Sequence, residues 1–131
     1  MADLFDPDEL TKLSEQIDPT TASPFDYYPL LQKGERFPIN DPDLAPRLSP
    51  RPANDVVFLH GILESVARIE RQAYDAIAAR GGPKPKRLFT AGGGSQNTVW
   101  TAIRARVLGI TPAPSAQTEA CVGIAKLINA Y

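Results

Sequence analysis

Proline is unevenly distributed along this chain, and its distribution limits the possible folds more than any other feature. Nine of the 13 prolines lie between Pro7 and Pro52. Because proline lacks a backbone donor and fixes φ, this segment can form neither a long helix nor a central strand. We therefore predict extended and turn structure from Asp18 to Ala53. A short helix from about Asp8 to Gln16 precedes it and carries an apolar stripe of Leu10, Leu13 and Ile17.

The proline-rich segment is nevertheless rich in apolar and aromatic side chains, namely Phe25, Tyr27, Tyr28, Leu30, Leu31, Phe37 and Leu44. A disordered linker would contain fewer of them. We therefore interpret residues 1–53 as an ordered, extended covering segment with a short N-terminal helix. It would pack on the remainder of the chain, residues 54–131.

The second part of the chain reads as α/β, mostly helical with one or two short strands. A long helix should begin near Asn54–Asp55 and end at Gly81-Gly82-Pro83. The run Leu88–Ala91 predicts a strand buried on both faces. Two more helices are expected, from about Ser95 to Val107 and from about Thr118 to Ala130. The apolar stripe of the long helix comprises Leu59, Ile62, Leu63, Val66, Ile69, Ala73 and Ile77. His60 lies on the same helix, and we expect it to be a structural or surface residue rather than a ligand.

Composition narrows the classes of function. The chain has 131 residues, 43% of them hydrophobic, a net charge of -1 and one cysteine. These values predict a globular cytoplasmic protein that binds neither nucleic acid nor membrane and has no intrachain disulfide. Residues 1–53 hold ten acidic and five basic residues, whereas residues 54–131 hold five and nine. The basic second part would suit a small anionic ligand, although ordinary surface charge explains it equally well.

Three consecutive glycines, Gly92, Gly93 and Gly94, stand between the predicted strand and the next helix. A helix start exposes unpaired N–H groups and a partial positive charge, and glycine lets a ligand approach the backbone closely. Neither a P-loop lysine nor the third glycine of a dinucleotide fingerprint follows. In a nucleotide site of another design, Asn97 would meet a base edge while the glycine amides face phosphate. The alternative is a tight turn with Ser95 as N-cap and no ligand.

Four segments in one order resemble the FGGY family of carbohydrate kinases. TAGGGSQNTVWTAIRARVLGI is similar to the family's adenine-nucleotide segment, and LLQKGERFP to its Leu-x-Gly-Glu-Arg-x-Pro segment. FLHGILESVARIERQ resembles its Val-Leu-Glu-Gly-Val-Ala helix, with Ser65 in place of the usual glycine, and QTEACVGIAKLI resembles its closing helix. The run DYYPLLQKGERFPINDPDLAPRLSPRPA looks most like plant and cyanobacterial members acting on ribulose or xylulose.

The resemblance implies the C-terminal, nucleotide-binding part of an actin-like, ribonuclease-H-like kinase that uses ATP and Mg²⁺. The adenine side falls on Gly92, Gly93, Gly94 and Asn97, with Gln96 lining the site. In such kinases the sugar site, the catalytic base and an Asp-x-Gly-Thr turn belong to an earlier domain, and no Asp-x-Gly-Thr occurs here. We therefore assign no catalytic residue and no protein metal ligand, and expect the chain alone to be inactive. Glu119 would organise the last helix, and Cys121 would be a small core residue.

Several alternatives stay open. The chain is expected to be a truncation product of a longer enzyme, to pair with a separate chain that carries the first domain, or to self-associate. A different class of function is a free-standing, non-catalytic module that binds nucleotide or a protein partner. A third is a purely structural helical protein, which would bind no ATP.

Overall fold

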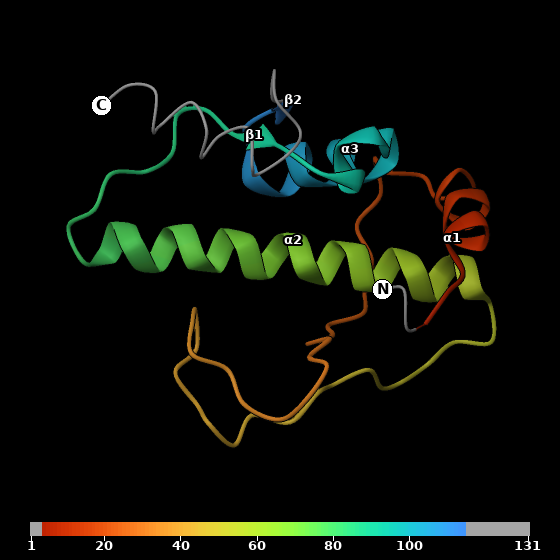
Figure 1. Cartoon of the computed structure of the whole chain (residues 1–131), viewed down its shortest axis with the longest axis horizontal. Helices are drawn as coiled ribbons and strands as arrows, with labels where there is room; N and C mark the ends of the chain where they lie inside the picture. The colour runs from red at the N-terminus through yellow and green to blue at the C-terminus, as the bar shows by residue number, and fades with distance from the viewer. Residues whose placement is uncertain (1–3, 115–131) are drawn as a thin grey trace, which may run out of the picture.

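The computed structural model describes residues 4–114, and a long central helix organises it. This helix, α2 (Asp55–Ala79), packs against α3 (Thr98–Leu108) and against the short α1 (Pro7–Ser14). Helices α1 and α3 lie on one side of α2, and the extended proline-rich segment runs along the other (Figure 1). No helix of residues 4–114 is long and apolar enough to cross a bilayer.

Helix α2 begins and ends where its sequence predicts. Asn54 is its N-cap, and the side chain accepts hydrogen bonds from the N–H groups of Val56 (2.9 Å) and Val57 (3.3 Å). The helix stops at Arg80, and Gly81 follows with a φ of 89°, a conformation that favours glycine. The short helix predicted from about Asp8 to Gln16 is also present, as α1 from Pro7 to Ser14, and Asp6 is its N-cap.

The start of α3 and the strand before it differ from prediction. Helix α3 starts at Thr98 rather than Ser95, because the 3₁₀ helix η1 (Gly93–Gln96) intervenes and Asn97 is the N-cap. Strand β1 (Phe89–Thr90) pairs in parallel with β2 (Ala113–Pro114), so β1, α3 and β2 form a minimal β-α-β unit. The prediction that both faces of the strand are buried is wrong: Leu88 is buried, but Phe89 is 65% exposed. No described element covers that face.

The core lies where the first half of α2 meets α1, α3 and the covering segment. It comprises Phe5, Ile17, Tyr27, Phe58, Leu59, Ile62, Leu63, Ala67, Ile103 and Val107. The Phe58 ring lies 6.2 Å from that of Phe5 and 5.6 Å from that of Tyr27, edge to face in the second pair. Aromatic residues from three distant parts of the chain therefore join in one cluster.

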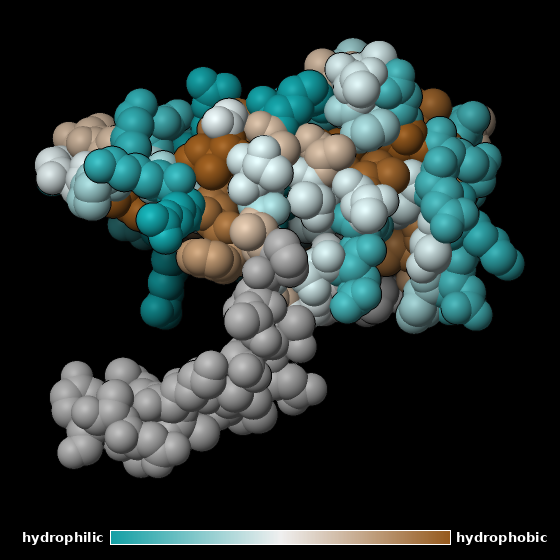
Figure 2. Space-filling view, turned by 90° about the horizontal axis from the view of Figure 1, so that it is seen from above, coloured by the Kyte–Doolittle hydropathy of each residue, from teal (hydrophilic) through white to brown (hydrophobic). Residues whose placement is uncertain are grey.

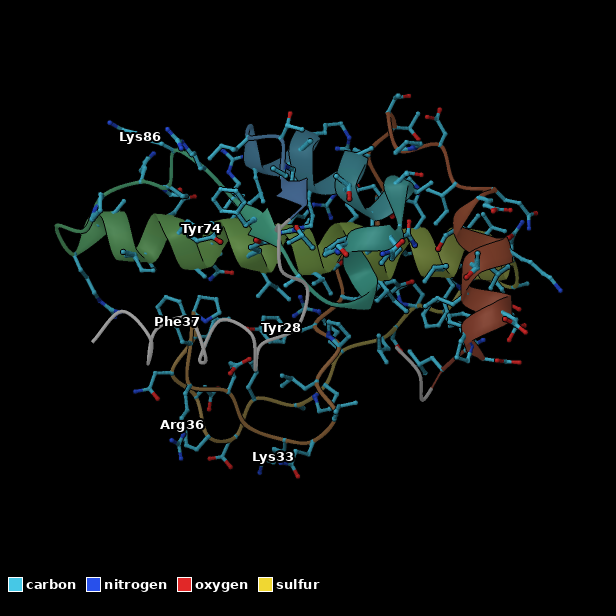
Figure 3. The ribbon with its side chains drawn as sticks, turned by 45° about the horizontal axis from the view of Figure 1, so that its top comes forward. Tyr28, Lys33, Arg36, Phe37, Tyr74 and Lys86 are labelled. Atoms are coloured by element: carbon cyan, nitrogen blue, oxygen red, sulfur yellow. The ribbon has the colours of Figure 1, made fainter. Side chains whose placement is uncertain are left out.

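The proline-rich segment is tied to α2 by specific hydrogen bonds. The Tyr27 N–H donates to Ser65 Oγ (2.9 Å), and this hydroxyl donates to the Gly61 carbonyl (2.7 Å). Tyr28 and Arg47 form an antiparallel bridge that closes a loop over residues 29–46. The side chains of Lys33 and Arg36 lie in this loop on the side away from α2 (Figure 3). The predicted helix at 118–130, with Glu119 and Cys121, lies outside the described residues.

Candidate functional site

The glycine turn connects β1 to the start of α3 and leaves backbone donors free. Gly92 has a φ of 81°, which a residue with a side chain rarely adopts. Asn97 Oδ1 accepts from the Trp100 N–H (2.9 Å), and the Asn97 carbonyl accepts from the Thr101 N–H (3.1 Å). The N–H groups of Thr98 and Val99 have no hydrogen-bond partner within residues 4–114. Two donors at the positive end of α3 are thus available to an anion.

Helix α1 approaches this turn from a distant part of the sequence. Asn97 Nδ2 donates to Ser14 Oγ (3.1 Å), and Ser14 is only 3% exposed. Asn97 therefore has two roles in the chain itself: it caps α3 and it anchors α1. The contact joins residues 83 positions apart, so it brings the N-terminal segment directly to the glycine turn.

Two adjoining hollows lie between α1 and the turn. Both are lined by Leu10, Ser14, Gly94 and Asn97. The larger hollow has a volume of about 430 Å³ and is also lined by Gln96. The smaller hollow has a volume of about 290 Å³, and Leu63, Val66 and Trp100 form its apolar walls. Small-molecule sites usually occupy about 300–1,000 Å³ and combine apolar walls with a few polar groups. The pair of hollows meets both conditions.

A third hollow of about 200 Å³ borders the same turn, and it is lined by Thr90, Ser95, Thr98, Thr101, Pro112 and Ala113. The Ser95 Oγ donates to the Gly92 carbonyl (2.6 Å) and so stabilises the turn. Thr98 borders both this hollow and the larger one next to α1. The turn therefore borders hollows on both its α1 side and its β1 side.

The structure brings most of the predicted site residues together. Gly94, Gln96 and Asn97 line the larger hollow, while Gly92 provides the unusual backbone angle and Gly93 begins η1. The wall contributed by α1, including Ser14, was missed, because nothing local in the sequence links residues 14 and 97. The capping role of Asn97 was not predicted, and Ser95 was named as N-cap only in the alternative without a ligand, although asparagine directly before a helical run is itself a capping signal.

A buried carboxylate holds the elements around the site in place. Glu64 is 1% exposed. Its Oε1 accepts hydrogen bonds from Arg106 Nη1 (3.0 Å) and from Arg68 Nη2 (3.4 Å). A second nitrogen of Arg106, Nη2, donates to Oε2. Arg106 also donates to the carbonyls of Pro19 (2.9 Å) and Thr21 (3.1 Å). His60 Nε2 lies 3.6 Å from Glu64 Oε2 and is buried with no hydrogen-bond partner among the described residues. Glu64 thus links α2, α3 and the covering segment.

A second ion pair connects α3 to the end of β1. Arg104 donates to Glu70 at 2.9 and 2.7 Å and to Thr90 Oγ1 at 2.6 Å. The hydrogen bond with Glu70 raises the pKa of Arg104 further above its ordinary value, so the guanidinium stays charged. No three His, Cys, Asp or Glu side chains of residues 4–114 lie close enough to hold a metal ion.

A strand, a glycine turn and a capped helix beside a partly apolar hollow are features of a nucleotide-binding domain. Comparison with protein families gives the class: the model of the FGGY family of carbohydrate kinases, C-terminal domain, matches residues 5–130. The chain belongs to the FGGY family of carbohydrate kinases and contains its C-terminal domain. Kinases of this family use ATP. The resemblance drawn from the four segments is confirmed at the level of family and domain.

Proposed function

We propose that this chain is the ATP-binding part of a kinase that transfers the γ-phosphate of ATP to a sugar hydroxyl. The observation that carries the proposal is that the N–H groups of Thr98 and Val99 have no partner within residues 4–114 and that both residues line the same hollow as Asn97. In this arrangement the purine occupies the hollow between α1 and α3, and the phosphates lie toward the glycine turn. Phosphoryl transfer depends mainly on such positioning and on stabilisation of charge.

Each predicted site residue has a role in this proposal. Gly92, Gly93 and Gly94 let the nucleotide approach the backbone, Asn97 donates to the base, and Gln96 lines the hollow. Mg²⁺ would be bound mainly by phosphate oxygens and water, since the described residues form no carboxylate cluster. It would neutralise the charge of the triphosphate, whereas the chain's own amides orient it.

The finer parts of the proposal rest on sequence likeness. The run from Asp26 to Ala53 favours a ketopentose such as ribulose or xylulose as acceptor. The sugar site and the catalytic base would lie outside this chain, so we expect it to bind ATP in the cytoplasm without turning it over. In this division residues 54–131 form the nucleotide-binding part, and residues 1–53 cover it and add the α1 wall of the hollow.

A free-standing interaction module is the second candidate, and exposed apolar side chains favour it. Leu31 is 83% exposed and Phe89 is 65% exposed. In this alternative such residues contact a separate chain that carries the rest of the kinase, or a second copy. Interaction surfaces are often marked by exposed apolar residues.

Isothermal titration with ATP and Mg²⁺ tests the proposal on the full chain. The informative variant is Asn97→Asp, since a carboxylate still caps α3 and still bonds Ser14 but has no N–H to donate. We expect the wild type to bind and the variant to lose at least about tenfold in affinity, with an unchanged melting temperature, because one hydrogen bond is lost and a negative charge is added. Absence of binding by the wild type would refute the proposal. Release of ADP with ribulose or xylulose would refute the expected inactivity.

A further inference from the structure

The orientation of the Asn97 side-chain amide is determined by the chain itself. The Trp100 backbone N–H can only donate, so the atom it meets must be the carbonyl oxygen Oδ1. The amide nitrogen Nδ2 is therefore the atom on the α1 side, where it donates one hydrogen to Ser14 Oγ. One hydrogen of Nδ2 remains, and Asn97 lines both hollows.

Ser14 adds a second donor at the same place. Its Oγ accepts from Asn97, and its own hydrogen has no acceptor among residues 4–114. Ser14 is 3% exposed and lines both hollows together with Asn97. A buried hydroxyl usually finds a use for its hydrogen, so a ligand in the hollow is a natural acceptor. The Ser14–Asn97 pair thus offers two donors, while Oδ1 faces the first turn of α3.

We propose that Ser14 contacts the nucleotide directly and that the Ser14–Asn97 pair recognises a ring nitrogen of the purine rather than its exocyclic amino group. This inference rests on the proposed nucleotide-binding function. Ring nitrogens are acceptors and complement the two free hydrogens of the pair, whereas an exocyclic amino group is itself a donor and would leave those hydrogens unpaired. Affinity should therefore not depend on the amino group that distinguishes adenine from unsubstituted purine.

The first experiment removes only that amino group from the ligand. The wild-type chain is titrated with ATP and with purine riboside triphosphate, which keeps every ring nitrogen, both with Mg²⁺. We expect the two dissociation constants to agree within about twofold, because the hydrogen bonds that the pair makes are the same. A loss of about fivefold or more with the analogue would mean that the amino group is read, and would overturn the inference.

The second experiment tests Ser14 directly. Ser14→Ala should weaken binding of both nucleotides by about three- to tenfold, the range expected for one lost hydrogen bond. Ser14→Thr keeps the hydroxyl and should restore most of the affinity. A purely structural role for Ser14 would instead lower the melting temperature of Ser14→Ala together with its affinity. Thr20→Ala is the control, since its hydroxyl belongs to the same segment but bonds only Asp18 (2.6 Å).

The outcomes separate this inference from the proposed function. Unchanged affinity in Ser14→Ala would overturn the role of Ser14 while the chain still bound ATP. A wild-type chain that binds neither nucleotide would instead refute the proposed function, and the inference with it. Thermal melting of each variant, followed by circular dichroism, shows that a loss of affinity comes from a folded protein.

Discussion

The two halves of α2 share one apolar stripe but have very different surroundings. Every residue buried in this helix lies between Phe58 and Ala67, where α1, α3 and Tyr27 pack on it. The apolar stripe continues into the second half, yet Ile77 there is 41% exposed. Seen from the α3 side, hydrophobic residues reach the surface in separate patches between hydrophilic ones (Figure 2). Helical periodicity therefore indicates which face of a helix is apolar, whereas neighbouring elements decide how much of that face is buried.

The largest expected difference between the halves concerns their acidic residues. Glu64→Gln removes the charge that Arg106 and Arg68 contact, and loss of one partner of a buried ion pair typically costs about 3–5 kcal/mol. Asp75→Asn is the matched change in the second half, where the pair with Arg71 spans 3.8 Å and both side chains are mostly exposed. We expect about 3 kcal/mol for the first and less than about 1 kcal/mol for the second. Urea unfolding measures both, and equal small losses would contradict a central role for Glu64.

Close packing of the covering segment on the first half predicts a smaller effect. A Cβ at Gly61 would lie 2.6 Å from Tyr27 Cε2 and 3.1 Å from Phe25 Cβ. Alanine favours a helix by about 1 kcal/mol over glycine, but overpacking costs about 1–3 kcal/mol. We expect Gly61→Ala to lower the free energy of unfolding by about 1 kcal/mol, in the same urea assay.

Gln72→Ala is the control for this change, because Gln72 is exposed in the second half of α2. It should alter stability by no more than about 0.5 kcal/mol. If Gly61→Ala were instead stabilising, Tyr27 would have moved aside. The covering segment would then be less rigidly held on α2 than its hydrogen bonds to Ser65 and Arg68 indicate.

Local signals explain which parts of the fold were predictable. The bounds of α2 and α1 could be predicted approximately from the sequence, because the residues that define the helix ends lie next to them. These residues are the N-caps Asn54 and Asp6 and the glycine that follows α2, Gly81. The glycine turn was likewise recognisable, because three glycines before a helix are unusual. The start of α3 was misplaced since both Ser95 and Asn97 are good capping residues, and only the three-dimensional turn decides between them.

Long-range contacts account for what the sequence did not reveal. Neither the contact from Asn97 to Ser14 nor that from Glu64 to Arg106 has a local signature. The exposed Phe89 was expected to be buried, because an apolar run carries no information about whether a second face is covered. The candidate site could thus be located from one segment, but its second wall required the fold.

The smallest difference between the two environments concerns two tyrosines, one in each. Tyr27 donates from its hydroxyl to the Pro50 carbonyl (2.6 Å) and is 1% exposed, whereas Tyr74 contacts Glu70 (3.3 Å) and is partly exposed. Tyr27→Phe should cost about 1 kcal/mol at neutral pH through the lost hydrogen bond. Tyr74→Phe should cost less, since its bond is longer and Glu70 keeps its contacts with Arg104.

Alkaline pH sharpens the same comparison. Burial raises the pKa of Tyr27 above its ordinary value of 10.0, so the folded chain keeps this proton where the unfolded chain loses it. Stability is then fully present below pH 10 and falls as the pH rises through the folded pKa. Tyr27→Phe removes this contribution, so the free energy of unfolding of the variant should decline less steeply above pH 10 than that of the wild type. Urea unfolding at a series of pH values measures both. Parallel curves would mean that the Tyr27 hydroxyl ionises as readily in the folded chain as in the unfolded one, which its position between Phe58 and the Pro50 carbonyl argues against.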